Sequence, residues 1–266
     1  MATALETEAN VVLPTSENEA IEAFGDGSGT TVLAGGTIVL PDITYGYIKP
    51  RRVLMLAGAG LSGIETGGSR TTIGAMTSVA DLVDLPAPLG PCAANVADRE
   101  IRAQATVGGN LCAGRGHEAP RGDLQAALLA LNAQVRSAGA GGERTESLEA
   151  FLADRDGRLL LDVSYEEPAA GGFARLDRPH THDYSALTVC AARGADGTLR
   201  IAVAGVAGPA VRLPSAEAKA DDPAAAGEAA AKDATFADDA LASAWYRERT
   251  LPVLVRRALT QLQEAA

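Results

Sequence analysis

The stretches AGGT at residues 34–37 and TVGGN at residues 106–110 decide the fold of this chain. In each, the glycine pair follows a run that predicts extended backbone, residues 31–33 in the first case and residues 101–107, directly before Gly108-Gly109, in the second. Because glycine has no Cβ, a Gly–Gly turn can expose backbone N–H groups to the oxygens of an anion. Two such turns brought together predict a grip on a diphosphate from both sides. On each motif alone, an ordinary tight turn is an equally good interpretation.

Neither turn has the sequence of a better-known nucleotide-binding loop. The chain has no GK[ST] tripeptide, which a Walker loop requires, and no GxGxxG motif on its opening strand. Lysine occurs only at positions 49, 219 and 232. A site that binds phosphate through backbone N–H groups therefore suits this chain.

Outward from these turns, the first two thirds of the chain predict two α/β units. Ser16 and Glu19 have the spacing of a capping box that opens a helix at residues 17–24. The other elements expected here are strands at 31–33, 53–56, 71–76 and 158–165, short helices at 77–82 and around 92–98, and a helix at 124–131 with Asp123 as its N-cap.

The last third has a different pattern, which predicts an antiparallel meander. Apolar strands are expected at 186–192 and 199–204, and the Ala195-Asp-Gly197 turn between them is a strong hairpin signal. Residues 216–244 are rich in Ala, Asp and Lys and fit either weak helix or a linker. Residues 251–263 have the apolar spacing of an amphipathic helix.

The fold class that we expect is α+β. Two α/β cofactor-binding subdomains, at residues 1–57 and 58–175, precede a small α+β domain at residues 176–266, which carries the antiparallel sheet and helices. The 266 residues, 47% of them hydrophobic, are enough for a sizeable core.

Composition excludes several classes of function. The 23 basic and 34 acidic residues give a net charge of −11, so the chain lacks the basic face that nucleic acid requires. No run of 18 apolar residues predicts a membrane span, and the acidic N-terminus does not resemble a signal peptide, so we expect a cytoplasmic protein. Three scattered cysteines and three histidines predict neither a disulfide framework, nor an iron–sulfur cluster, nor a metal site. A redox role would need an organic cofactor.

The motifs occur in an order that resembles the flavin-binding medium subunit of the molybdenum hydroxylases, the family of xanthine dehydrogenase, aldehyde oxidase and aerobic carbon monoxide dehydrogenase. The resemblance runs from about residue 12 to residue 262. The segments that carry it are AGGTIVLP (34–41), LSGI (61–64), TTIGAMTSVADL (71–82), IRAQATVGGNLC (101–112), APRGDLQAALLALNA (119–133) and YRERTLPVLVRRAL (246–259).

This resemblance implies non-covalent FAD held between two subdomains of the PCMH-type fold, with a third domain completing the flavin pocket. It implies that the two glycine loops hold the diphosphate, that Asp123 binds a ribose hydroxyl, and that Leu160 contacts the isoalloxazine ring through its backbone. The loop residues that it assigns to the cofactor are Leu33, Ala34, Gly35, Gly36 and Thr37 in the first loop, and Thr106, Gly108, Gly109 and Asn110 in the second. It assigns no catalytic acid, base or metal ligand to this chain.

The chain departs from the family pattern in three places. Ile38 follows AGGT where the family commonly has Asp, a position that we expect to cap a helix. Residues 113–119 contain an insertion of about four residues between Cys112 and Pro120, which brings His117 and Glu118 near the ribose region as surface residues or as new contacts. The family's pocket lysine in the third domain has no clear counterpart, and Arg178 is the nearest candidate.

The function that the resemblance implies is an electron-transfer subunit. FAD on this chain would take electrons from 2Fe–2S clusters on a small partner subunit and pass them to NAD or another acceptor. Molybdopterin would lie on a large partner subunit, in a heterotrimer that allows a further dimer. Two alternatives are a stand-alone FAD-dependent oxidase of the same fold and a regulatory module that binds a dinucleotide without redox chemistry.

Overall fold

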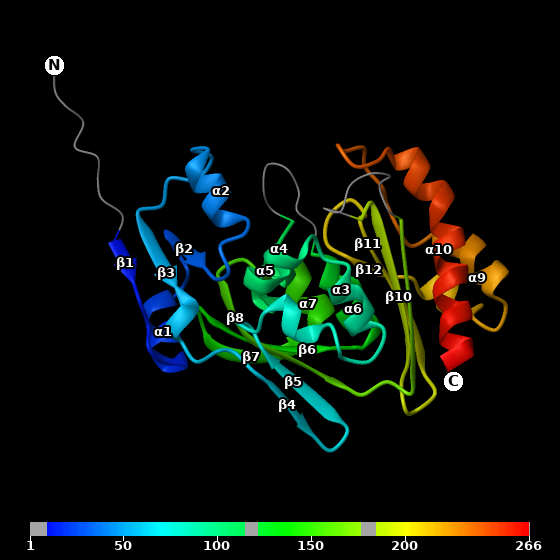
Figure 1. Cartoon of the computed structure of the whole chain (residues 1–266), viewed down its shortest axis with the longest axis horizontal. Helices are drawn as coiled ribbons and strands as arrows, with labels where there is room; N and C mark the ends of the chain where they lie inside the picture. The colour runs from blue at the N-terminus through cyan, green and yellow to red at the C-terminus, as the bar shows by residue number, and fades with distance from the viewer. Residues whose placement is uncertain (1–9, 115–121, 177–184, 266) are drawn as a thin grey trace.

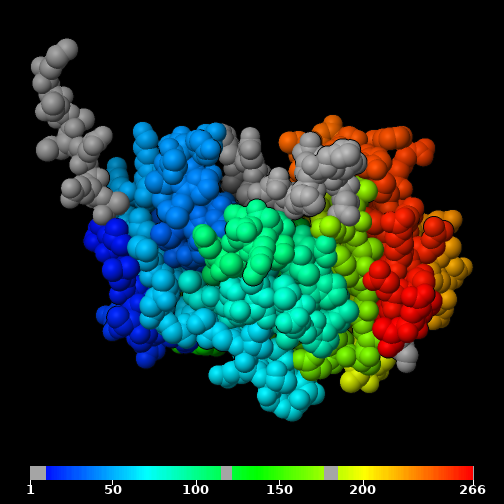
Figure 2. Space-filling model, in the orientation of Figure 1, coloured from blue at the N-terminus to red at the C-terminus, as the bar shows by residue number. Residues whose placement is uncertain are grey.

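The computed structural model describes residues 10–114, 122–176 and 185–265, and contains three sheets in series along the molecule (Figure 1). In the space-filling view, the first and third units lie on opposite sides of the second (Figure 2). The mixture of helix and sheet confirms the expected α+β class. Within the described residues, no helix combines the length and the apolar character needed to cross a bilayer.

The first unit is a three-stranded parallel sheet with strand order β1-β3-β2. Parallel neighbours need crossover connections, and helices supply them here. Its elements are β1 (Asn10–Val12), α1 (Glu17–Phe24), β2 (Thr30–Leu33), α2 (Val39–Thr44) and β3 (Arg52–Met55).

The capping box at the start of α1 forms only in part. The Ser16 hydroxyl accepts a hydrogen bond from the Glu19 N–H at 3.3 Å, as expected. The Glu19 carboxylate, however, accepts from the Thr15 N–H at 2.7 Å and from the Thr15 hydroxyl at 2.9 Å. The glutamate therefore closes the turn one residue earlier than a standard capping box does.

The second unit is a five-stranded sheet with the order β4-β5-β8-β6-β7, and all its pairings are antiparallel. Short helices lie along one side of it (Figure 1). The strands are β4 (Ile64–Gly67), β5 (Arg70–Gly74), β6 (Gln134–Gly139), β7 (Gly142–Ser147) and β8 (Arg158–Glu166). The α-helices are α3 (Leu89–Ala94), α4 (Arg99–Gln104), α5 (Val107–Cys112), α6 (Asp123–Ala130) and α7 (Leu148–Ala153), and 3₁₀ turns occupy Leu56–Gly58 and Val79–Leu82.

The expectation of extended backbone at residues 101–107 is wrong, because two helices meet there. The Asp98 carboxylate accepts from the Ile101 N–H at 2.7 Å and caps α4, while the Thr106 hydroxyl accepts from the Gly109 N–H at 3.1 Å and caps α5. These capping side chains outweigh the β-branched composition. Only the first glycine motif follows a strand, since the second opens a helix.

Two smaller helix predictions also need correction. The helix expected around residues 92–98 ends at Ala94. Asp123 is the first residue of α6 and not its cap, because Gly122 occupies the N-cap position and provides no side-chain hydrogen bond. The Asn110 carbonyl oxygen Oδ1 accepts from the Leu124 N–H at 2.9 Å instead, so a side chain from α5 satisfies the start of α6.

The third unit is an antiparallel sheet with strand order β12-β11-β10-β9, covered by helices on its outer side (Figure 1). The predicted hairpin is confirmed, with Arg193 paired to Leu199 at its end. The strands are β9 (Ala170–Leu176), β10 (Leu187–Arg193), β11 (Leu199–Ala204) and β12 (Val211–Arg212), and the helices are α8 (Pro214–Glu217), α9 (Pro223–Ala230) and α10 (Ala244–Ala265). Because β9 belongs to this sheet, we propose that the third unit begins near residue 168 and not at residue 176.

Both faces of the third sheet are buried. Leu187, Val189 and Ile201 point toward the helices of the third unit, whereas Cys190 and Ala202 point toward the second unit. Helix α6 is buried at every residue from 123 to 130, as expected for a helix packed on all sides. The second and third units therefore share one core around α6.

Candidate cofactor site

A cavity of about 770 Å³ lies between the first and second units. Every site residue assigned from the sequence except Leu33 lines it, and Leu33 is buried at the end of β2. The lining residues that were expected are Ala34, Gly35, Gly36, Thr37, Thr106, Gly108, Gly109, Asn110, Asp123 and Leu160. His117, Glu118 and Arg178 lie outside the described residues. Within the described part of the chain, no residue of the third unit lines this cavity.

The AGGT loop presents a run of backbone donors. The N–H groups of residues 34–38 form no hydrogen bond with another described residue, although all five residues line the cavity. The Gly36 carbonyl accepts from the Leu40 N–H at 3.0 Å, which turns the chain into α2. Gly36 has a φ of +76°, a conformation that glycine adopts without strain. Consecutive N–H groups in such a turn form a concave site for an anion.

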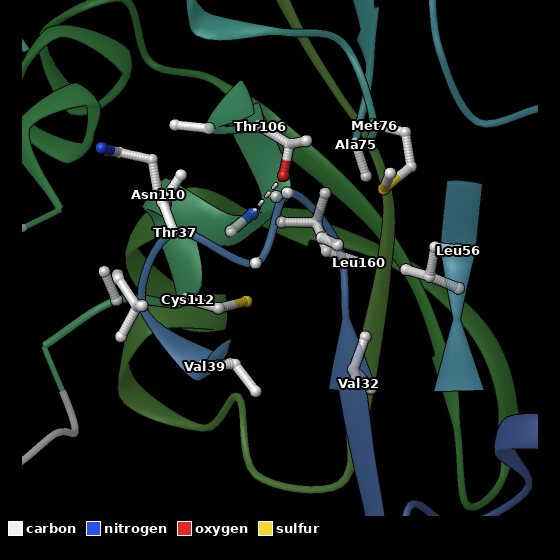
Figure 3. Close-up of a pocket in the computed structure, with 18 of the residues that line it drawn as sticks. Val32, Thr37, Val39, Leu56, Ala75, Met76, Thr106, Asn110, Cys112 and Leu160 are labelled. Atoms are coloured by element: carbon white, nitrogen blue, oxygen red, sulfur yellow. Dashed lines mark hydrogen bonds between the residues drawn. The ribbon is translucent and has the colours of Figure 1, made fainter. Parts of the chain in front are cut away.

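The second motif contributes differently, because its glycine amides have partners within the chain. The Val107 N–H donates to the Thr77 carbonyl at 3.0 Å, and the Gly108 N–H donates to the Ala75 carbonyl at 2.8 Å. The Gly109 N–H donates to the Thr106 hydroxyl at 3.1 Å (Figure 3). Gly108 and Gly109 therefore line the cavity with backbone that carries no side chain, and Thr106 and Asn110 line it beside them.

The cavity has a polar side and an apolar side. In Figure 3, Val32, Leu56 and Leu160 gather on one side with Met76, while Thr37, Asn110 and Cys112 lie on the other together with Val39. A ligand with an anionic centre and a planar apolar ring matches this division. The apolar side includes Val32 of β2 and Leu160 of β8. Leu56 and Met76 complete it, and the sequence did not identify them because they resemble ordinary core residues.

Arg155 is a further lining residue that sequence reasoning missed. Its side chain is 6% exposed, and it donates from Nη1 to the Leu111 carbonyl at 2.7 Å and from Nη2 to the Ala113 carbonyl at 2.9 Å. A cation is favourable at these last carbonyls of α5. In the sequence, its DRDG surroundings resemble a surface turn, so no signal distinguished it.

These features suit FAD. The unpartnered N–H groups match a diphosphate, the glycines leave room for it, and the apolar side matches a ring system. Among the described residues, no cluster of three or more His, Cys, Asp or Glu could hold a metal ion. The fold and the cavity thus define a protein that holds a dinucleotide cofactor between a parallel three-stranded unit and an antiparallel five-stranded unit.

Comparison with known proteins identifies the family of cofactor-binding proteins to which this chain belongs. The family model for the FAD-binding domain in molybdopterin dehydrogenase matches residues 6–164. This chain belongs to that family.

Curated relatives cover nearly the whole chain. The nicotine 6-hydroxylase medium subunit of Paenarthrobacter nicotinovorans is 28% identical, over 93% of this chain and 95% of the relative. The carbon monoxide dehydrogenase medium chain of Hydrogenophaga pseudoflava is 27% identical, over 92% and 94%. A solved structure of carbon monoxide dehydrogenase from the same organism matches with a TM-score of 0.85 and 27% identity, over 97% of this chain and 98% of that one.

Proposed function

We propose that this chain is the FAD-carrying electron-transfer subunit of a cytoplasmic, multi-subunit molybdenum hydroxylase. A small partner subunit with 2Fe–2S clusters would donate electrons, a large partner subunit would hold molybdopterin, and NAD or another acceptor would take the electrons up. Relatives named as a medium subunit and a medium chain support this role. The observation that carries it is the row of N–H groups at residues 34–38, which have no partner among the described residues and which belong to residues that line the same cavity as α5.

Each part of the cavity has a proposed task. The N–H groups of residues 34–37 donate to the diphosphate oxygens, while Gly108 and Gly109 allow those oxygens to approach α5. The side chains of Thr106 and Asn110 add polar contacts. The carboxylate of Asp123 accepts from a ribose hydroxyl, and Leu160 lies against the isoalloxazine ring.

FAD, when bound, supplies the redox chemistry, and the protein supplies binding and orientation. The walls of the cavity exclude water from the ring, and the fixed N–H groups balance the diphosphate charge. Because Cys112 lies on the polar side with Thr37 and Asn110, we propose that the cofactor is held without a covalent bond (Figure 3).

Purification of the tagged chain from its own cells tests this function. We expect flavin absorbance that is released by denaturation, no iron in the isolated chain, and copurification of a large molybdenum-containing protein and a small iron–sulfur protein. A colourless chain would contradict the role in redox chemistry. A yellow chain that is isolated alone and that oxidises a small molecule with oxygen would favour the stand-alone oxidase.

A further inference from the structure

Gln125 is a polar side chain within α6, a helix that is buried at every residue. It is 2% exposed, and every residue of α6 around it is buried. A buried amide that lacks hydrogen-bond partners is costly, so a glutamine persists at such a position only when its own groups are satisfied. The partners of Gln125 belong to two different units of the protein.

The amide joins α5 to the third unit. Nε2 of Gln125 donates to the Leu111 carbonyl at 2.9 Å, and Oε1 accepts from the Ala210 N–H at 3.0 Å. Leu111 directly follows Asn110 in α5, whereas Ala210 directly precedes β12. One planar group therefore connects the wall of the cavity to the third sheet.

The surroundings of the amide allow little adjustment. A Cβ on Gly122 would lie 2.3 Å from Nε2 of Gln125 and 2.7 Å from the backbone carbonyl oxygen of Asn110. Gly122 has a φ of −78°, so close packing and not backbone conformation requires a glycine there. The backbone before α6 thus closes over the Gln125 amide and holds it in one orientation.

The Leu111 carbonyl has a second donor, Nη1 of Arg155. Arg155 comes from the loop before β8, in the same unit as α5, and so it fixes α5 locally. The hydrogen bond from Gln125 is different, because the other end of its amide is held by the third unit. Hydrogen bonds in such a chain polarise and strengthen one another.

We propose that Gln125 is a positioning residue that couples the packing of the third unit against the second to the retention of the cofactor. The third unit has no described residue in the cavity lining, and the two hydrogen bonds of this amide connect it to α5. The proposal rests on the proposed binding of FAD in the cavity. A residue that merely satisfied the core would affect the unfolding temperature alone, whereas a positioning residue also affects cofactor release from the folded protein.

Gln125→Met tests this coupling, because methionine has a similar length and volume but cannot form either hydrogen bond. Gln261→Met makes the same substitution at an exposed position and serves as the control: Oε1 of Gln261 accepts from the Phe173 N–H at 3.0 Å, within the third unit and away from the cavity. For each protein we would measure FAD release on dilution, well below its unfolding temperature, and amide hydrogen exchange of the FAD-free protein.

We expect Gln125→Met to release FAD roughly tenfold faster than wild type, as the loss of one buried hydrogen bond suggests. Amide exchange should become faster in α5 and at Ala210 together, and Gln261→Met should resemble wild type in both measurements. Gln125→Glu, which keeps an acceptor for Ala210 but loses the donor to Leu111, should also release FAD faster.

Wild-type release rates in both Gln125 variants would overturn the proposal and leave the FAD assignment intact. If the wild-type chain itself binds no FAD, the proposed function fails, and the exchange measurement still decides whether Gln125 links the two units. Unchanged exchange in α5 of a folded Gln125→Met protein would overturn that link.

Discussion

The backbone of Gly35 passes so close to Gln104 that a Cβ on residue 35 would lie 1.9 Å from the Gln104 carbonyl oxygen. Gly35 belongs to the first unit and Gln104 ends α4 of the second, so the two walls of the cavity meet here backbone to backbone. The closeness of this contact, and not an unusual φ at Gly35, is what requires a glycine. It sets the separation of the two surfaces that face the cofactor.

Gly35→Ala is therefore expected to push the walls apart and to reduce FAD retention. Overpacking of this kind costs about 1–3 kcal/mol of stability, so the protein should remain folded. Gly67→Ala is the control, because a Cβ there would meet nothing within 4 Å. The ratio of flavin to protein absorbance after gel filtration measures the effect. Full FAD occupancy in the Gly35 variant would show that the contact does not control the cavity.

Asn110→Asp should separate the two roles of this side chain. Aspartate keeps an oxygen for the Leu124 N–H, which Asn110 Oδ1 accepts at 2.9 Å, and a negative charge is favourable at the start of α6. The same charge would repel a diphosphate. We expect weaker FAD binding with little change in the unfolding temperature, measured by flavin fluorescence titration and calorimetry. Asn110→Ala, by contrast, should lose about 1 kcal/mol of stability because the start of α6 loses its cap.

Asp123→Asn should raise the dissociation constant of FAD by roughly tenfold to a hundredfold, because a hydrogen bond to a charged group contributes about 1.5–3 kcal/mol. Gly122 and not Asp123 is the N-cap of α6, so helix capping does not explain such a loss. Glu118→Gln is the control and should bind FAD like wild type. Isothermal titration of the FAD-free proteins gives both constants, and the reverse pattern would assign the ribose contact to Glu118.

Glu17→Gln should destabilise the protein only above acidic pH. Arg136 donates to both Glu17 oxygens, at 2.6 and 2.8 Å, and these hydrogen bonds lower the pKa of Glu17 from its ordinary value of 4.5. A lowered pKa stabilises the folded state above 4.5, and this contribution is lost as the pH falls through the folded value.

Because both side chains are about one third exposed, we expect a difference of no more than about 1 kcal/mol at pH 7. Urea unfolding of wild type and Glu17→Gln at pH 7 and at a series of pH values below 4.5 measures it, and the difference should shrink progressively as the pH falls. Glu143→Gln, which removes the negative charge from the acceptor of a single hydrogen bond at 2.9 Å from Arg136, should have a smaller effect. A difference that is equal at all these pH values would contradict the ion pair as its cause.

Cys112 should be the cysteine that reports cofactor binding. It is partly exposed and lines the cavity, whereas Cys92 and Cys190 are buried. A hydrogen bond with the Cys190 thiol, together with burial, raises the pKa of Cys92 well above its ordinary value, and a protonated thiol reacts slowly.

We expect one rapid alkylation in the FAD-free protein, at Cys112, and slower alkylation when FAD is bound. Peptide mass spectrometry identifies the labelled residue, and Cys112→Ser should abolish the rapid phase. Equal labelling rates with and without FAD would place the cofactor away from α5.

Local chemistry alone determined much of this protein. The apolar runs at 186–192 and 199–204 with the Ala195-Asp-Gly197 turn between them predict the β10–β11 hairpin, and Ser16 predicts the start of α1, because these signals act between residues close in sequence. The glycine pairs at 35–36 and 108–109 mark the positions where backbone must approach something closely. The order of these motifs was sufficient to indicate the family.

Tertiary structure decided how those motifs are used. The sequence does not distinguish the open N–H groups of residues 34–38 from the occupied ones of Val107 and Gly108, because the partners of the latter, Thr77 and Ala75, lie about 30 residues away in the chain. The same holds for Gln125, whose amide reads as an ordinary helix residue until folding brings Leu111 and Ala210 to its two ends. Hydrogen bonds between distant segments depend on how whole units pack together, and no local pattern encodes them.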